Sequence, residues 1–232
     1  MEKNALSRIC EVVNSLGDYK NVVMICDENT YRVAGRIVEE FIQLKQKIVL
    51  SPNGLHADEH AVYLVEDTLN SSCDLLLAVG SGTIHDITRY VAYEKGLQFV
   101  SVPTAPSVDG FVSSVCAMTW KGVKRTLTAV PPLALVADSD VMTNAPLKMI
   151  NSGIGDMLGK YIALFDWKIS SMLTGEYYCD YVASLMKSAL DQVVSNIEKI
   201  KTRDVHAIES LIYGLVLSGL AMQMTGNSRP AS

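Results

Sequence analysis

The chain has 232 residues, 49% of them hydrophobic, so it is long enough to bury a substantial core in one large domain or two smaller ones. Acidic residues outnumber basic ones by 25 to 20, and the net charge is -5. This balance argues against nucleic acid or an anionic membrane surface as a partner, because both attract basic proteins.

Cysteine use and the chain's start bear on its location. The cysteines occur singly, without the CxxC pair of a zinc or redox site, at Cys10, Cys26, Cys73, Cys116 and Cys179. This pattern fits a reducing cytoplasm. The first 16 residues carry several charges and lack the apolar region of a signal peptide. The apolar stretch 211–224, at about 14 residues, is short of the roughly 20 that span a bilayer, so we expect a buried core helix.

Short apolar runs alternate with helical patterns in the first part of the chain, which is typical of βαβ units and a parallel sheet. Strands are predicted at 22–26, 48–50, 75–79, 99–102 and 133–137. Helices are predicted between them at 30–45, 58–70 and 84–95. The runs 115–120 and 123–128 flank Lys121-Gly122 and predict a hairpin.

After Pro146 the pattern becomes helical, with helices predicted at 150–171, 176–199 and 204–225. We therefore expect an α/β N-terminal domain over 1–145, with a parallel sheet and nucleotide-binding loops. An all-α domain over 146–232 would follow, and it looks incomplete because the chain stops in a turn-like run.

A glycine-rich segment follows the predicted strand 75–79 and opens the next helix. Its residues are Gly80, Ser81, Gly82, Thr83, Ile84, His85 and Asp86. Glycines let the backbone approach an anion, and the helix N-terminus supplies free N–H groups, so the segment is a candidate phosphate cradle. An ordinary strand-to-helix turn is the alternative. The segment lacks the third glycine of the GxGxxG pattern and does not follow the first strand, so an ordinary Rossmann fingerprint is not supported.

Two other strand ends carry polar residues. The segment after 99–102 contains Thr104, Ala105, Pro106, Ser107 and Asp109, at a carboxyl end where ligands collect in α/β sheets. The composition is equally that of a loop with a turn at Asp109-Gly110. Asp27 follows the first strand and either bonds a ribose hydroxyl or caps the next helix, capping being the preferred interpretation.

Asp156 lies among small residues in the apolar helical stretch Ser152-Gly153-Ile154-Gly155-Asp156. A buried carboxylate needs a cation, a hydrogen-bond donor or a metal as its partner. The alternative is an acid near a helix N-terminus, where the helix dipole favours it.

In this order, the segments 80–86, 103–110 and 152–160 and the closing run 226–232 resemble the glycerol-1-phosphate dehydrogenase family. That family belongs with iron-containing alcohol dehydrogenases, glycerol dehydrogenases and dehydroquinate synthases. The resemblance implies that Asp27 lies near the adenosine ribose and that residues 80–86 hold the pyrophosphate of NAD(H) or NADP(H). It further implies coenzyme contacts from 104–107 and Ser113, a catalytic and substrate-binding Asp109, and a catalytic, substrate-binding and metal-ligating Asp156.

The resemblance also implies a reaction: a zinc or nickel ion polarises the C2 oxygen of dihydroxyacetone phosphate, and hydride from the nicotinamide gives sn-glycerol 1-phosphate for phospholipid biosynthesis. Homo-oligomers are implied as well. The family's two metal-binding histidines lie beyond the end of this sequence, and none of its histidines occupies their positions: His56, His60, His85 and His206. From the 232 residues alone we expect coenzyme binding with severely impaired catalysis.

Other interpretations stay open. Glycerol dehydrogenase and dehydroquinate synthase share the fold, and a basic residue such as Lys160 or Arg229 facing a substrate phosphate would distinguish a phosphorylated substrate. Lys160 can equally be a solvated helix residue. A non-catalytic nucleotide-binding or subunit-interaction module is the alternative from another class, and an exposed apolar face on the helical part would favour association.

Overall fold

The computed structural model describes residues 1–231 and divides into two compact units. The first unit comprises Met1–Ala105 and Gly110–Met142. The second comprises Pro106–Asp109 and the chain from Thr143 onward. Loop 106–109 therefore belongs with the helical unit, although it follows a strand of the sheet in sequence.

The first unit is built on a parallel sheet of five strands in the order β2-β1-β3-β4-β7. The strands are β1 (Val22–Asp27), β2 (Gln46–Leu50), β3 (Leu75–Gly80), β4 (Gln98–Pro103) and β7 (Ala134–Leu135). Every residue of β1 and β3 is buried, as expected for central strands covered on both faces. The predicted α/β fold with a parallel sheet is confirmed.

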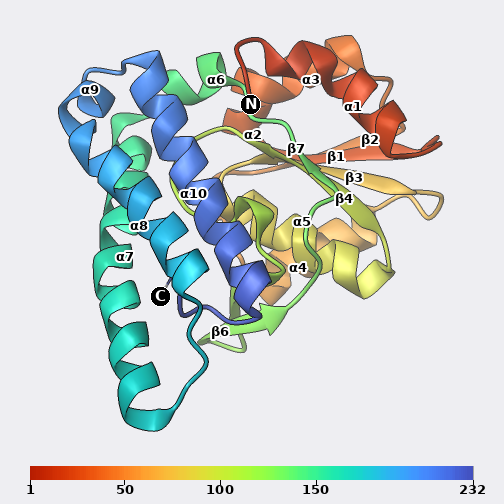
Figure 1. Cartoon of the computed structure of the whole chain (residues 1–232). Coiled ribbons are helices and arrows are strands. Elements are labelled where there is room, and N and C mark those ends of the chain that lie inside the picture. The colour runs from red at the N-terminus through yellow and green to blue at the C-terminus, as the bar shows by residue number, and fades with distance from the viewer. Residues whose placement is uncertain (232) are drawn as a thin grey trace. The chain divides into compact units, whose positions relative to one another are not determined.

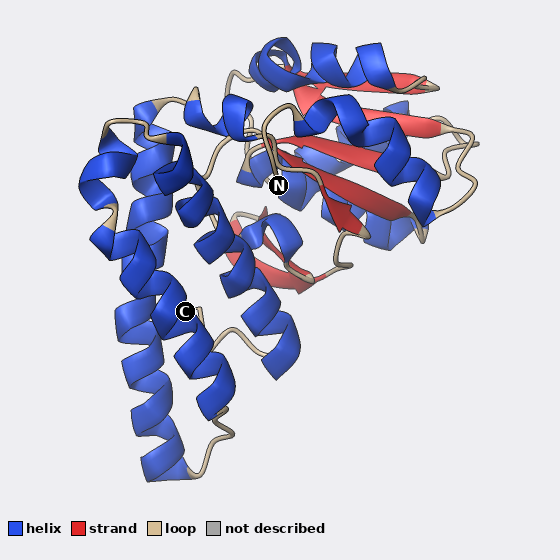
Figure 2. Ribbon diagram, turned by 45° about the horizontal axis from the view of Figure 1, so that its top comes forward, coloured by secondary structure: helices blue, strands red, loops and turns tan. Residues whose placement is uncertain are grey.

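Helices cover both faces of this sheet (Figures 1 and 2). One face packs against η1 (Ala5–Arg8), α1 (Ile9–Leu16) and α3 (Arg36–Phe41), and the other against α4 (Glu59–Thr68) and α5 (Gly82–Lys95). Side chains alternate between the two cores along each strand, so Met24 joins the first and Val23 the second. The N-terminal helix was not predicted from the sequence.

Shorter elements complete the first unit. A single turn, α2 (Glu28–Thr30), leads into a π-helical turn, η2 (Tyr31–Gly35), and then α3, where one helix over 30–45 was predicted. That prediction was too long because Ile42 adopts an extended conformation. The predicted hairpin is confirmed as β5 (Val115–Trp120) and β6 (Val123–Thr128), preceded by η3 (Gly110–Val112). α6 (Ser139–Thr143) contains Met142, the last residue of the first unit.

The second unit is helical, with α7 (Leu147–Thr174), α8 (Asp180–Ser195), α9 (Ile197–Lys201) and α10 (Val205–Thr225). The three long helices run alongside one another (Figure 1). α8 begins later than predicted, because Gly175 ends α7 in a left-handed conformation and an extended segment follows. The indole of Trp167 donates a 2.7 Å hydrogen bond to the Tyr177 carbonyl and fixes that segment.

Helix α10 is long and apolar enough to cross a bilayer by length and composition, criteria that core helices also meet. Half of its most apolar window is buried within the structure, where side chains such as Leu211 and Leu215 are fully enclosed. This packing is that of a core helix, as the sequence suggested.

Candidate functional site

The order of strands defines a ligand-binding edge in the first unit. From β1 the chain crosses to β2 on one side, and from β3 it crosses to β4 on the other. The carboxyl ends of β1 and β3 therefore form a topological switch point, where open α/β sheets bind their ligands. Ile25 pairs with Ala78, so the register brings Asp27 level with Gly80 at this edge.

The segment after β3 turns directly into α5. A Cβ on Gly80 would lie 2.6 Å from Cβ of Ile84, so only glycine fits this tight turn. Ser81 is the N-cap of α5, and its side chain makes no capping hydrogen bond. The N–H groups of the first helical turn are thus not satisfied by that side chain and are suited to an anion.

Asp27 caps the next helix, α2, which confirms the interpretation preferred from the sequence. Its Oδ1 accepts hydrogen bonds from the backbone N–H groups of Asn29 at 2.8 Å and Thr30 at 2.9 Å. The Thr30 hydroxyl oxygen in turn accepts from the N–H of Asp27 at 3.0 Å. These bonds do not use Oδ2 of Asp27, so the cap is compatible with a second role for the carboxylate at the switch point.

The ring of His85 points into the core. Nδ1 lies 2.9 Å from the Ser81 carbonyl oxygen, which can only accept, so Nδ1 carries the proton and Nε2 accepts from the Ser101 hydroxyl at 2.8 Å. Burial, with a smaller contribution from the nearby Arg89, lowers the pKa of His85 to about 3, although the bond to the Ser81 carbonyl acts in the opposite direction. Both ring nitrogens of His85 are therefore occupied within the protein, so the ring is not available to bind a phosphate. The ring packs edge-on against Phe111.

Arg89 was not recognised from the sequence. Its fully buried guanidinium pairs with Asp86 at 2.8 Å and donates to the carbonyl oxygens of Gly110 and Val115. It therefore ties helix α5 to the segment that leads into the hairpin. The i,i+3 spacing of Asp86 and Arg89 could have predicted this ion pair, but residues at that spacing more often form a solvated pair on a helix surface.

The remaining candidates of the first unit are also buried. The Thr104 N–H donates to the Gly80 carbonyl at 3.0 Å and links the ends of β4 and β3. The Ser113 hydroxyl makes two local hydrogen bonds of 3.0 Å, donating to the carbonyl and accepting from the N–H of Val115. Ala105 is enclosed and contributes packing only through its methyl group.

The second unit brings Asp109 and Asp156 together. The N–H of Asp109 donates to Oδ2 of Asp156 at 2.8 Å, and Nζ of Lys160 lies 2.7 Å from a carboxylate oxygen of each. The Ser218 hydroxyl on α10 donates to Oδ2 of Asp109 at 2.8 Å. Asp156 lies in the third turn of α7, so the alternative of a helix N-terminal acid is wrong.

Lys160 is buried, which excludes the interpretation as a solvated helix residue. Burial alone would lower its pKa, but the carboxylates of Asp109 and Asp156 raise the pKa of Lys160 above its usual value. The lysine is therefore a protonated ammonium between two acids. Its spacing from Asp156 was visible in the sequence, whereas Asp109 and Ser218 come from distant segments.

Loop 106–109 lies directly against α7. A Cβ on Gly153 would overlap the carbonyl oxygen of Pro106, so the absent side chain is what admits the loop. Ser107 is buried in the same loop. The small residues beside Asp156 thus make room for another part of the chain, where the sequence suggested space for a substrate.

A zinc or nickel site does not fit the residues present. Within residues 1–231, no three His, Cys, Asp or Glu side chains are grouped as metal ligands, and both oxygens of Asp156 already accept hydrogen bonds. Arg229 does not present a free guanidinium for a phosphate either. It binds both oxygens of Glu176, at 2.7 and 2.8 Å. Ser232, at the end of the closing run, lies outside the described residues.

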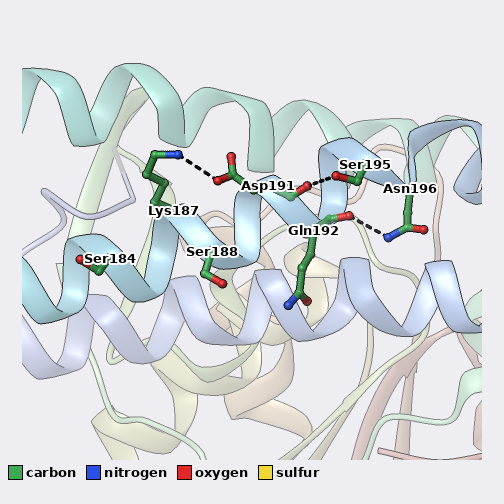
Figure 3. Close-up of a pocket in the computed structure, with 7 residues that line it drawn as sticks. All are labelled: Ser184, Lys187, Ser188, Asp191, Gln192, Ser195 and Asn196. Atoms are coloured by element: carbon green, nitrogen blue, oxygen red, sulfur yellow. Dashed lines mark hydrogen bonds and ion pairs between the residues drawn. The ribbon is translucent and has the colours of Figure 1, made fainter.

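A surface hollow along α8 is unrelated to these residues (Figure 3). Its lining comes entirely from that helix and its C-cap, with serines, Gln192 and Asn196 beside the ion pair of Lys187 and Asp191. None of the lining residues is a candidate from the sequence. A second hollow lies beside Val22 at the start of β1, the edge opposite to the switch point.

Comparison with known proteins identifies the family of the chain. A family model described as iron-containing alcohol dehydrogenase matches residues 1–146. A protein from Bacillus licheniformis named glycerol-1-phosphate dehydrogenase (NAD(P)+) is 41% identical, with 99% of this chain and 59% of that protein covered. The protein of the same name from Saccharolobus solfataricus is 37% identical, with 88% and 58% covered. The chain therefore spans less than two thirds of these relatives.

Solved structures share the fold. Glycerol dehydrogenase from Schizosaccharomyces pombe has a TM-score of 0.77 at 21% identity, with 95% of this chain and 59% of that chain covered. An iron-containing alcohol dehydrogenase from Thermotoga maritima has a TM-score of 0.76 at 16% identity, with 98% and 67% covered. At these identities the comparison supports the fold alone.

Proposed function

The chain belongs to the iron-containing alcohol dehydrogenase family, and we propose that it comprises the coenzyme-binding unit and part of the helical unit of a glycerol-1-phosphate dehydrogenase. The reaction would transfer hydride between NAD(P)H and C2 of dihydroxyacetone phosphate, with sn-glycerol 1-phosphate as the product for phospholipid biosynthesis. The observation that carries the proposal is the uncapped N-terminus of α5 beside Asp27, at the switch point of the sheet.

The first unit would bind the coenzyme. Backbone N–H groups at the start of α5 would hold the pyrophosphate, since the helix dipole favours a negative charge there. Oδ2 of Asp27 would accept a hydrogen bond from the adenosine ribose, and Thr104, Ala105 and Ser113 of the same unit would complete the contacts. A carboxylate beside the ribose disfavours a 2′-phosphate, so NADH is the preferred coenzyme.

The second unit would bind the triose. The Asp109 and Asp156 carboxylates accept hydrogen bonds, and a substrate hydroxyl is a suitable donor for their remaining lone pairs. A metal-dependent enzyme would need a set of ligands for zinc or nickel, and the described residues do not assemble one. The second unit, as described, therefore offers hydrogen-bond acceptors for a triose but not a metal site.

Coenzyme binding and turnover can be tested separately. We expect NADH to bind to the purified chain, as measured by its fluorescence, whereas turnover of dihydroxyacetone phosphate with added zinc or nickel is expected to be severely impaired. Loss of NADH binding in a folded chain would overturn the proposal. Turnover of free dihydroxyacetone in preference to the phosphate would indicate a glycerol dehydrogenase. NADH binding without even residual turnover of either triose would favour a non-catalytic nucleotide-binding module.

A homo-oligomer is part of the same proposal. Helix α7 exposes apolar side chains at alternating spacings of four and three residues: Leu158, Ile162, Phe165, Ile169 and Met172. This is the heptad spacing with which helices pair, and it favours association of two copies through α7. Sedimentation velocity should detect a dimer that the double variant Ile162→Ser/Phe165→Ser weakens. The free cysteines of the described residues fit the proposed cytoplasmic location.

A further inference from the structure

Lys160 joins two acids from different segments of the second unit. Nζ lies 2.7 Å from Oδ2 of Asp109, in loop 106–109, and 2.7 Å from Oδ1 of Asp156, one turn earlier on α7. The lysine side chain is only 3% exposed. Because water is largely excluded, these ion pairs are stronger than surface pairs, and removing one partner leaves a poorly solvated charge.

The second contacts of each acid fix its orientation toward the lysine. The Ser218 hydroxyl donates to the same Oδ2 of Asp109, and the Asp109 N–H donates to Oδ2 of Asp156. Both oxygens of Asp156 therefore already face a hydrogen-bond donor. A divalent cation binding at Asp156 would meet the Lys160 ammonium at close range, and like charges at this distance repel each other strongly.

The same geometry argues against a phosphate at Lys160. An ammonium group has three N–H donors, and two are directed at carboxylates. A phosphate that used the third would be close to two negative charges. The lysine is thus better suited to holding the acids than to binding a phosphorylated substrate directly.

We propose that Lys160 is the resident cation of the Asp109–Asp156 pair, a positioning residue whose ammonium occupies the place that a divalent cation would need between the two carboxylates. Its charge keeps the loop carrying Asp109 on helix α7 and prevents the acids from capturing a metal ion by themselves. The inference concerns the two acids of the proposed triose site, but it rests on their contacts with Lys160 and not on the proposed activity.

Manganese(II) is the appropriate probe, because it prefers oxygen ligands and binds thiols weakly, so the free cysteines interfere little. Free Mn²⁺ is measured by electron paramagnetic resonance during titration of the full chain. The variants are Lys160→Gln, which removes the charge, and Lys160→Arg, which keeps it. Lys168→Gln is the matched control, since Lys168 lies on the same helix in an exposed ion pair with Asp180.

We expect Lys160→Gln to bind one Mn²⁺ at least about tenfold more tightly than the unchanged chain, because two carboxylates become available to it. Lys160→Arg and Lys168→Gln are expected to bind as the unchanged chain does. Equal affinity in Lys160→Gln and the unchanged chain would overturn the proposal, as would a similar gain in Lys160→Arg. If Lys160 only held the loop on α7, its replacement would separate Asp109 from Asp156 and would give no gain in Mn²⁺ affinity.

A second measurement decides the question if Lys160→Gln fails to fold, as judged by circular dichroism. In the unchanged chain labelled with ¹⁵N-lysine, a buried and paired ammonium should give a slowly exchanging NMR signal, assigned by its loss in Lys160→Arg. We expect this signal to persist in millimolar Mn²⁺. Selective paramagnetic broadening at lower concentrations would place the metal beside Lys160 and refute the resident-cation assignment.

Discussion

Gly153 lies so close to the carbonyl oxygen of Pro106 that the smallest side chain would overlap it. Gly153→Ala is therefore expected to push loop 106–109 away from α7, with a loss of about 1–3 kcal/mol in the free energy of unfolding from overpacking. The hydrogen bond between the Asp109 N–H and Asp156 should weaken with it. Urea unfolding measures the first effect, and amide hydrogen exchange at Asp109 measures the second.

Gly155 provides the control on the same helix. A Cβ at this position meets no atom within 4 Å, so Gly155→Ala should stabilise α7 by up to about 1 kcal/mol through helix propensity. The two alanine variants are thus expected to change stability in opposite directions. Equal effects would mean that the loop does not rest on Gly153.

His85 makes stability depend on pH. Its pKa is lowered to about 3 in the folded chain, against 6.5 ordinarily, so below about pH 6.5 the unfolded chain takes up a proton that the folded chain does not. The free energy of unfolding should therefore fall from pH 7.5 to 5.5, approaching about 1.4 kcal/mol per pH unit at the acidic end. Urea unfolding across this range measures it.

Two variants test whether His85 causes this pH dependence of stability. His85→Gln removes the titrating ring and should flatten the dependence, although its stability at pH 7.5 will be lower. His206→Gln is the matched control, because it removes an exposed histidine instead of the buried one. A slope that survives in His85→Gln would have to come from another group.

The sheet was largely predictable because its strands are buried on both faces. Continuous apolar runs of this length, such as β1 and β3, are typical of strands that are covered on both faces. The turn residues Lys121-Gly122 located the hairpin. Helix limits were less predictable. Ile42 leaves the helical conformation and Tyr177 is held by Trp167, and neither effect is encoded in a local pattern of hydrophobicity.

The candidate site was predictable only in part, for a related reason. The acids themselves stood out, because a carboxylate in an apolar segment needs a partner. The partner of Asp156 could not be chosen from the sequence, since Lys160 at i+4 fits a surface ion pair as well as a buried one. What decided it was the approach of Asp109 and Ser218, which depends on the packing of the loop and of α10 against α7.

Arg89 is expected to be essential for the stability of the first unit. Arg89→Met would leave the carbonyls of Gly110 and Val115 without this donor and Asp86 without this cation, at a cost of about 3–5 kcal/mol. Arg89→Lys should lose less, because it keeps the charge but not the forked geometry. Urea unfolding compares them with Arg125→Met, an exposed control on β6 that should change stability by less than about 0.5 kcal/mol. A similar loss in both methionine variants would contradict this role.

Ser81 allows coenzyme binding to be separated from folding. Ser81→Asp supplies a capping carboxylate at the start of α5, so the melting temperature should stay the same or rise. The same carboxylate would repel the pyrophosphate, and the dissociation constant for NADH should increase at least about tenfold. Ser71→Asp, at an exposed position, controls for the added charge. Unchanged NADH affinity in Ser81→Asp would remove this helix end from the proposed coenzyme site.

Asp27 should set the choice between the two coenzymes. Asn is as good an N-cap as Asp, so Asp27→Asn can keep the hydrogen bonds to Asn29 and Thr30 and change stability by less than about 0.5 kcal/mol. It removes the negative charge that would repel a 2′-phosphate. The ratio of NADPH to NADH affinity, measured by fluorescence titration, should therefore rise by about tenfold.

Asp58→Asn is the matched control for this change, because Asp58 caps α4 in the same way, by accepting from the N–H of Ala61 at 2.9 Å. It removes the same charge from the N-cap of a helix that does not follow β1 or β3, the strands of the switch point. We expect it to leave the NADPH to NADH ratio unchanged. If both variants leave that ratio unchanged while Asp27→Asn still folds, Asp27 acts only as a cap, and coenzyme choice must come from residues other than the carboxylate at the end of β1.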